Sequence, residues 1–139
     1  MITFTYEDGS TETVEIIDKN KLDECCDKTI AIKTDMDTIS EAMFIGFNKL
    51  QEVVFTAETT INNSAFSMCT SLKLVHFADK VNLSRFAFMG CCNLQTLRVD
   101  PTKMTIKWMT NKYCLNFLQV EVKPENLYYL CKSINVKDL

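Results

Sequence analysis

Residues 59–77, TTINNSAFSMCTSLKLVHF, place apolar side chains at spacings that fit neither one helix nor one strand. A helix needs apolar positions three and four apart throughout, whereas a half-buried strand alternates apolar and polar residues. Here the first part has a turn-like or helical spacing, while Val75 and Phe77 at its end alternate as in a strand. The pattern predicts one short supersecondary unit that ends in a strand.

The same pattern recurs 22 residues upstream and 22 residues downstream without a gap. Six apolar columns result: Ile39, Ile61 and Leu83; Phe44, Phe66 and Phe88; Phe47, Cys69 and Cys91; Leu50, Leu72 and Leu94; Val53, Val75 and Leu97; and Phe55, Phe77 and Val99. Weaker copies at residues 17–32 and 106–122 flank these three. The sequence therefore predicts three units that follow the pattern fully and two that follow it only in part.

A period of 22 residues lies inside the range of about 20–29 that is typical of leucine-rich repeats. One unit cannot bury its apolar face alone, but stacked units share a continuous core. We therefore expect an α/β solenoid, a short right-handed coil of about five units of 22–23 residues. The strand of each unit should be its L-x-x-V-x-F end, as in Leu72, Val75 and Phe77.

The pattern predicts one domain over residues 1–139, with 1–16 as a hairpin cap, 17–123 as repeats and 124–139 as a C-terminal cap. Alternating Ile2, Phe4 and Tyr6 precede a turn at Asp8-Gly9, which is typical of a β-hairpin. Residues 124–134, PENLYYLCKSI, begin with proline and space their apolar residues as a helix does.

The segments INNSAFSMCTSLKLVHF and LSRFAFMGCCNLQTLRV resemble the BspA-like class of leucine-rich repeats, whose unit is roughly I-x-x-x-A-F-x-x-C-x-x-L-x-x-V-x-I. The unit at 39–55 departs from that pattern, with Met43 for Ala and Phe47 for Cys. The resemblance implies protein binding or adhesion rather than catalysis. Members of the class are commonly bacterial or protozoan surface or secreted proteins.

Composition narrows the functional classes. The net charge of −3 gives no basic excess for nucleic acid. No apolar run reaches the roughly 18 residues of a membrane span. The opening MITFTYEDGS lacks the features of a signal peptide. We therefore expect a cytoplasmic protein, with a secreted or surface location as the alternative if an export segment was removed.

The seven cysteines and the single histidine do not form a catalytic or metal-binding pattern. Four thiols share one repeat column and should be reduced and buried: Cys25, Cys69, Cys91 and Cys114. The chain has no paired C-x-x-C motif for zinc and no glycine-rich phosphate loop. His76 should project from the exposed strand face, away from the thiols. We predict no catalytic residues, no metal and no cofactor.

The exposed strand face is the remaining candidate site. The predicted partner-binding residues are Val54, Leu74, His76, Thr96, Arg98, Gln119 and Glu121. Apolar and directional polar groups mixed in this way suit a protein partner. We therefore expect a noncatalytic protein-interaction module.

Four alternatives stay open. The face could be merely solvated, or the chain could be an adhesin fragment. It could instead self-assemble, with its acidic N-terminal part against the basic C-terminal part of another copy. It could also be an enzyme or redox protein that uses exposed thiols.

Overall fold

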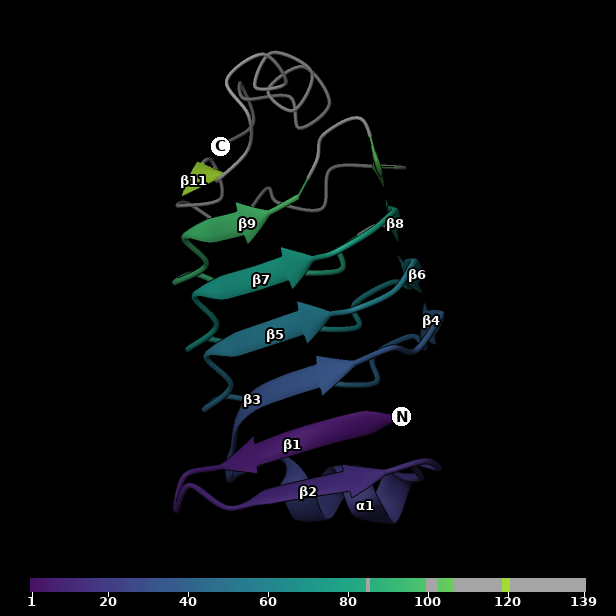
Figure 1. Ribbon diagram of the computed structural model, residues 1–139. Helices are drawn as coiled ribbons and strands as arrows, with labels where there is room; N and C mark the ends of the chain where they lie inside the picture. The colour runs from purple at the N-terminus through teal and green to yellow at the C-terminus, as the bar shows by residue number, and fades with distance from the viewer. Residues whose placement is uncertain (85, 100–102, 107–118, 121–139) are drawn as a thin grey trace.

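The computed structural model describes residues 1–84, 86–99, 103–106 and 119–120. These residues form two β-sheets and one short helix, α1 (Lys19–Cys25). The first sheet has the order β11 (Gln119–Val120), β9 (Thr96–Arg98), β7 (Leu74–Phe77), β5 (Glu52–Phe55), β3 (Thr29–Thr34), β1 (Ile2–Tyr6) and β2 (Thr11–Val14). The second has the order β10 (Met104–Ile106), β8 (Val81–Leu83), β6 (Thr59–Ile61) and β4 (Thr38–Ile39). Figure 1 shows the strands of the first sheet stacked one above another along the molecule.

The first sheet confirms that a strand lies at the end of each regular unit, although β7 begins at Leu74 and leaves Leu72 outside the strand. Strands β3, β5, β7, β9 and β11 pair in parallel, each with the strand of the next unit. Val53 pairs with Val75, and Val75 pairs with Leu97, so the 22-residue columns are cross-strand neighbours. Successive strand residues point to opposite faces of a sheet, which buries Val75 and Phe77 and turns Leu74 and His76 outward.

The second sheet corrects the expectation of an α/β solenoid, because the described regular units contain a second short strand rather than a helix. Strands β4, β6, β8 and β10 also pair in parallel, and turns connect them to the strands of the first sheet. Thr59 and Ile61 are buried and Thr60 between them is half-buried, which is the alternation of a strand. Such a strand is too short to give a periodic signal, and its β-branched residues suit the extended conformation. In the part of the chain that the structure describes, α1 is the one helix.

The core lies between the two sheets and consists of the repeated apolar columns. The ring of Phe66 stacks on Phe44 with centroids 5.2 Å apart, and on Phe88 at 5.6 Å. Phe55 stacks on Phe77 at 5.1 Å. These phenylalanines are at most 4 % exposed. Each of these rings stacks on the ring at the equivalent position of a neighbouring unit. This contact explains why the same residue type recurs at that position in successive units.

The N-terminal residues form a hairpin and a helix. Strands β1 and β2 pair antiparallel, and β1 also pairs antiparallel with β3, so the hairpin continues the first sheet. Figure 1 shows α1 behind β2 at this end. The helix begins after Asp18, whose side chain accepts a hydrogen bond from the backbone N–H of Lys21. The predicted C-terminal helix and most of the last weak unit lie outside the described residues.

Candidate interaction surface

The outward residues of the first sheet form continuous rows across neighbouring strands. One row joins Lys33, Val54, His76 and Arg98 on strands β3, β5, β7 and β9. A second row joins Ala31, Glu52, Leu74, Thr96 and Gln119. Because the strands are parallel and in register, the side chains of each row are direct neighbours and form one continuous surface.

The sequence-predicted site residues therefore share one face as far as the structure describes them. Four of them are half-buried: Val54, Leu74, His76 and Thr96. Arg98 is exposed. Gln119 is in register with Thr96, although only its place in β11 is described, and Glu121 lies outside the described residues.

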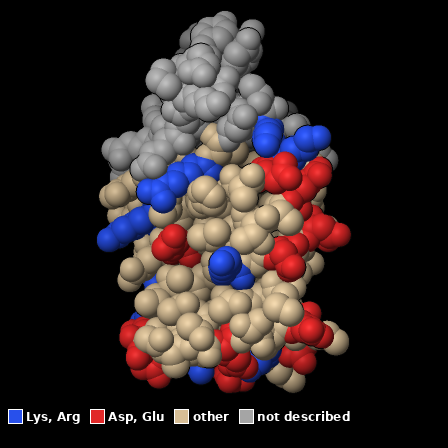
Figure 2. All heavy atoms as spheres, in the orientation of Figure 1, with Lys and Arg blue, Asp and Glu red and all other residues tan. Residues whose placement is uncertain are grey.

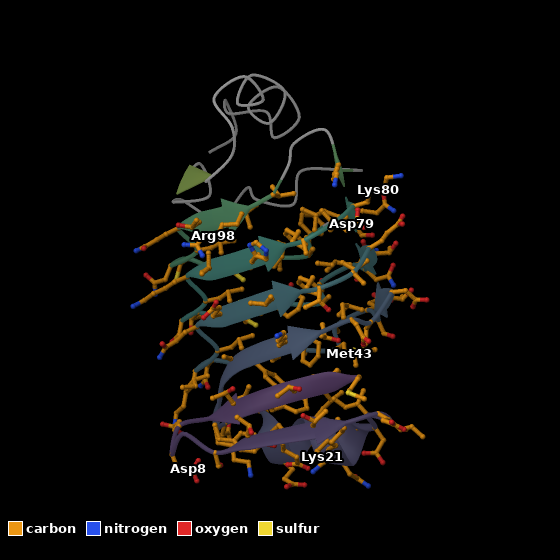
Figure 3. The ribbon with its side chains drawn as sticks, in the orientation of Figure 1. Asp8, Lys21, Met43, Asp79, Lys80 and Arg98 are labelled. Atoms are coloured by element: carbon orange, nitrogen blue, oxygen red, sulfur yellow. The ribbon has the colours of Figure 1, made fainter. Side chains whose placement is uncertain are left out.

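Charge is unevenly distributed around this face. Figure 2, which views the molecule from the same side as Figure 1, shows a mostly uncharged band with acidic groups along the right-hand edge. Exposed carboxylates follow the carboxyl ends of three strands at Asp35, Glu58 and Asp79. Figure 3 labels Asp79 beyond the end of β7, and Arg98 lies on the neighbouring strand β9 in register with His76. The face thus offers an apolar centre with charged borders.

The described cysteines do not supply a nucleophile for His76. Cys25, Cys69 and Cys91 are fully buried, as the repeat column predicted. The thiol of Cys91 donates to the backbone carbonyl of Phe66, 3.1 Å away, on the core side of the unit. Cys26 is half-buried and Cys92 exposed, and Cys114 lies outside the described residues. Among the residues that the structure describes, no group of three His, Cys, Asp or Glu side chains could hold a metal ion.

A polar network that no sequence pattern predicted joins α1 to the hairpin. The hydroxyl of Tyr6 donates to Glu12, 2.7 Å away, and lies 3.3 Å from the thiol of Cys25. The ammonium of Lys21 also bonds Glu12. Burial raises the pKa of Tyr6, and its hydrogen bonds to Cys25 and Glu12 raise it further. Residues of this network are 6 to 19 apart in the chain, which no short motif reveals.

Within the described ranges, no helix combines the length and apolarity needed to span a bilayer.

Parallel strands stacked at a 22-residue spacing from β5 to β9 define the class: a leucine-rich-repeat solenoid. A family model described as "BspA type Leucine rich repeat region (6 copies)" matches residues 9–118, and the chain belongs to this family. The match confirms the resemblance seen in the repeat units. It begins inside the hairpin, before the first unit that the sequence pattern delimits. Comparisons with curated proteins and with solved structures each gave no significant match.

Proposed function

We propose that the chain is a noncatalytic module that binds a protein partner through the outward face of its first sheet. The observation that carries the proposal is the register of the two rows, which sets half-buried Val54 and Leu74 beside His76, Thr96 and Arg98. Solenoid sheets present extended surfaces of this kind to partners.

The composition of the face favours a protein over a nucleic acid. Val54 and Leu74 are neighbours of polar groups that form directional hydrogen bonds, which is the mixture found at protein interfaces. A phosphate backbone requires a cluster of cations. Here the strand ends carry Asp35, Glu58 and Asp79 instead.

The noncatalytic part of the proposal is supported by the position of the thiols. His76 is on the outward face of β7, whereas Cys69 and Cys91 are on the core side of their units and donate to backbone carbonyls. A thiol nucleophile needs a base within hydrogen-bond reach.

The experiment is an affinity pull-down from the source organism, read by mass spectrometry. The lysate and the surface fraction are treated separately, which also distinguishes a cytoplasmic from a surface location. The wild-type chain is compared with the double variant His76→Ala, Arg98→Glu and with the single variant Leu74→Asp. A matched control, Thr60→Ala, Lys80→Glu, makes the same kinds of change on and beside the second sheet.

We expect one protein to be retained by the wild type and the control and lost by both face variants. The face variants should keep their unfolding free energy within about 1 kcal/mol of the wild type, as surface changes usually do. Phe66→Ala, which removes a buried ring, should cost about 3–5 kcal/mol and marks the scale of a core defect. Equal retention by all variants would reject the face as the site, and recovery of only the chain itself would favour self-association.

A further inference from the structure

A cavity of about 420 Å³ lies between α1 and the return segment that follows β4. Its apolar lining comprises Ile17, Leu22, Cys26, Met43, Ile45 and Phe47. The volume falls in the range of about 300–1,000 Å³ that is usual for ligand pockets. Met43 and Phe47 stand where the neighbouring units have Ala65 and Cys69, so the departures from the repeat pattern enlarge the apolar wall of this cavity. Figure 3 places Met43 in the N-terminal half of the molecule.

The return segments of neighbouring units are joined by hydrogen bonds that run in one direction. The backbone N–H groups of Ala42, Phe44 and Gly46 donate to the carbonyls of Asn63, Ala65 and Ser67 at 3.1, 2.8 and 2.9 Å. Phe66 and Met68 donate in the same way to Ala87 and Met89. The N–H groups of these alternate residues thus point toward the following unit, and the carbonyls that accept from them point toward the preceding unit.

The first of these units has no preceding return segment, because α1 stands in its place. The carbonyls equivalent to those of Asn63, Ala65 and Ser67 belong to Glu41, Met43 and Ile45, and these three residues line the cavity. Over the described ranges, no backbone N–H donates to any of the three carbonyls.

In the described ranges, no N–H group of α1 donates to these carbonyls. The N–H groups of Leu22 and Cys26 donate to the carbonyls of Asp18 and Leu22, and that of Lys21 donates to the carboxylate of Asp18. Beside these bonds, the thiol of Cys26 donates to the carbonyl of Gly46 at 3.4 Å, and Gly46 is not one of the three residues. The row of acceptors lies beside an apolar cavity, and an extended peptide can present its alternate N–H groups to such a row.

The rim of the cavity carries more negative than positive charge. Asp18, Asp23 and Glu41 contribute three carboxylates, whereas Lys19 contributes the one ammonium among the lining residues. The nearby ammonium of Lys21 is bonded to Glu12 and lies 3.4 Å from Glu24. A segment with cationic side chains would complement this rim.

We infer that the cavity is a second binding site, which takes an extended peptide segment of a partner protein with one apolar side chain flanked by Lys or Arg. The peptide N–H groups pair with the carbonyls of Glu41, Met43 and Ile45, and its apolar side chain fills the space between Leu22 and Phe47. This site is distinct from the outward face of the first sheet, so either proposal can fail without the other.

Fluorescence anisotropy with labelled ten-residue peptides tests the inference. A basic series has a central Leu, Phe or Trp flanked by Lys, and a matched acidic series has Glu in place of Lys. A third series carries N-methyl groups on the alternate amides of one edge of the basic peptides, which removes donors and keeps the side chains.

The variant Ile45→Ser removes apolar lining, and Met68→Ser is its control, because both side chains are 49 % exposed and only Ile45 lines the cavity. The variant Asp23→Lys, Glu41→Lys reverses the rim charge, and Glu15→Lys, Glu58→Lys makes the same change elsewhere on the exposed surface. All four changes leave the buried core intact.

We expect the basic series to bind the wild type and both controls. The rim variant should bind about fivefold more weakly, since each exposed ion pair contributes modestly. Ile45→Ser and the N-methylated series should each lose about tenfold, because each removes a contact that the peptide needs.

Three results would overturn the inference. Equal binding of the basic and acidic series would show that the charge of the rim does not select the peptide. Unchanged binding of the N-methylated series would show that the peptide N–H groups do not pair with the carbonyl row. A dimer in sedimentation that dissociates in Ile45→Ser would assign the cavity to a second copy of the chain.

Discussion

The thiol of Cys69 donates a hydrogen bond to the backbone carbonyl of Phe44, 3.2 Å away in the preceding unit. Cys91 bonds Phe66 in the same way, so the bond repeats along the solenoid. Both thiols are fully buried. The cysteine column therefore combines a small apolar side chain with a link between successive units.

Cys69→Ala should lower the free energy of unfolding by about 1–2 kcal/mol, because it leaves a small void and removes a buried donor. Cys92→Ala is the control, since Cys92 is exposed and should stay within about 0.5 kcal/mol of the wild type. Urea unfolding followed by circular dichroism measures both. Equal stability of the two variants would show that the column contributes little.

The close approach of Met68 to Gly90 gives a second prediction. A Cβ on Gly90 would stand 2.5 Å from the Sδ of Met68, and Gly90 has a φ of +78°. Gly46, the equivalent residue in another unit, has a φ of +74° and open space around it. Gly46→Ala should therefore cost about 1 kcal/mol in backbone strain alone, and Gly90→Ala should cost more.

The extra cost of Gly90→Ala should disappear in a Met68→Ala background, where the sulfur is gone. Thermal unfolding of the two single glycine variants and of the two double variants with Met68→Ala measures the coupling. A cost for Gly90→Ala that stays above that of Gly46→Ala in both backgrounds would contradict the contact.

Acid should weaken the contact between the hairpin and α1. The hydrogen bond from Lys21, and then that from Tyr6, lowers the pKa of Glu12 below its ordinary value of 4.5. A depressed pKa in the folded state means that the contribution of Glu12 is complete above the unfolded pKa and is lost as pH falls through the folded pKa. The loss should therefore occur below about pH 4.5.

Glu12→Gln should be less stable than the wild type at neutral pH and should lose less stability on acidification. Urea unfolding at a series of pH values gives both quantities. Glu15→Gln, a change of equal charge at an exposed neighbour, should follow the wild type. The same acid dependence in Glu12→Gln as in the wild type would disprove the assignment.

Thiol reactivity tests the redox alternative. Burial, and then the charges of Asp27 and Asp23, raise the pKa of Cys26, and a higher pKa leaves less of the reactive thiolate. Among the described cysteines, Cys92 should be alkylated first at neutral pH, Cys26 more slowly, and the three buried thiols only on unfolding. Peptide mapping after timed alkylation gives the order. Fast labelling of Cys26 would restore the case for a reactive thiol.

The sequence by itself determined the repeat. Its period and columns depend on side-chain identity at positions 22 apart, and parallel stacking turns that spacing into direct neighbours such as Val53 and Val75. The outward rows followed from the same register, because strand alternation fixes which of His76 and Phe77 faces the core. The resemblance to the family rested on these positions as well.

Only the tertiary structure decided the second sheet, the Tyr6 network and the cavity beside α1. Strand β6 is three residues long, too short for a periodic signal, and forms because its neighbours on both sides supply the missing hydrogen bonds. Tyr6, Glu12, Lys21 and Cys25 come together only when the hairpin packs on the helix. The sequence shows that Met43 and Phe47 depart from the repeat pattern. That they line a cavity depends on α1, the element that precedes their unit in the structure. With a helix in that place, no backbone N–H of the described residues donates to the carbonyls of Glu41, Met43 and Ile45, and the sequence pattern alone does not predict this.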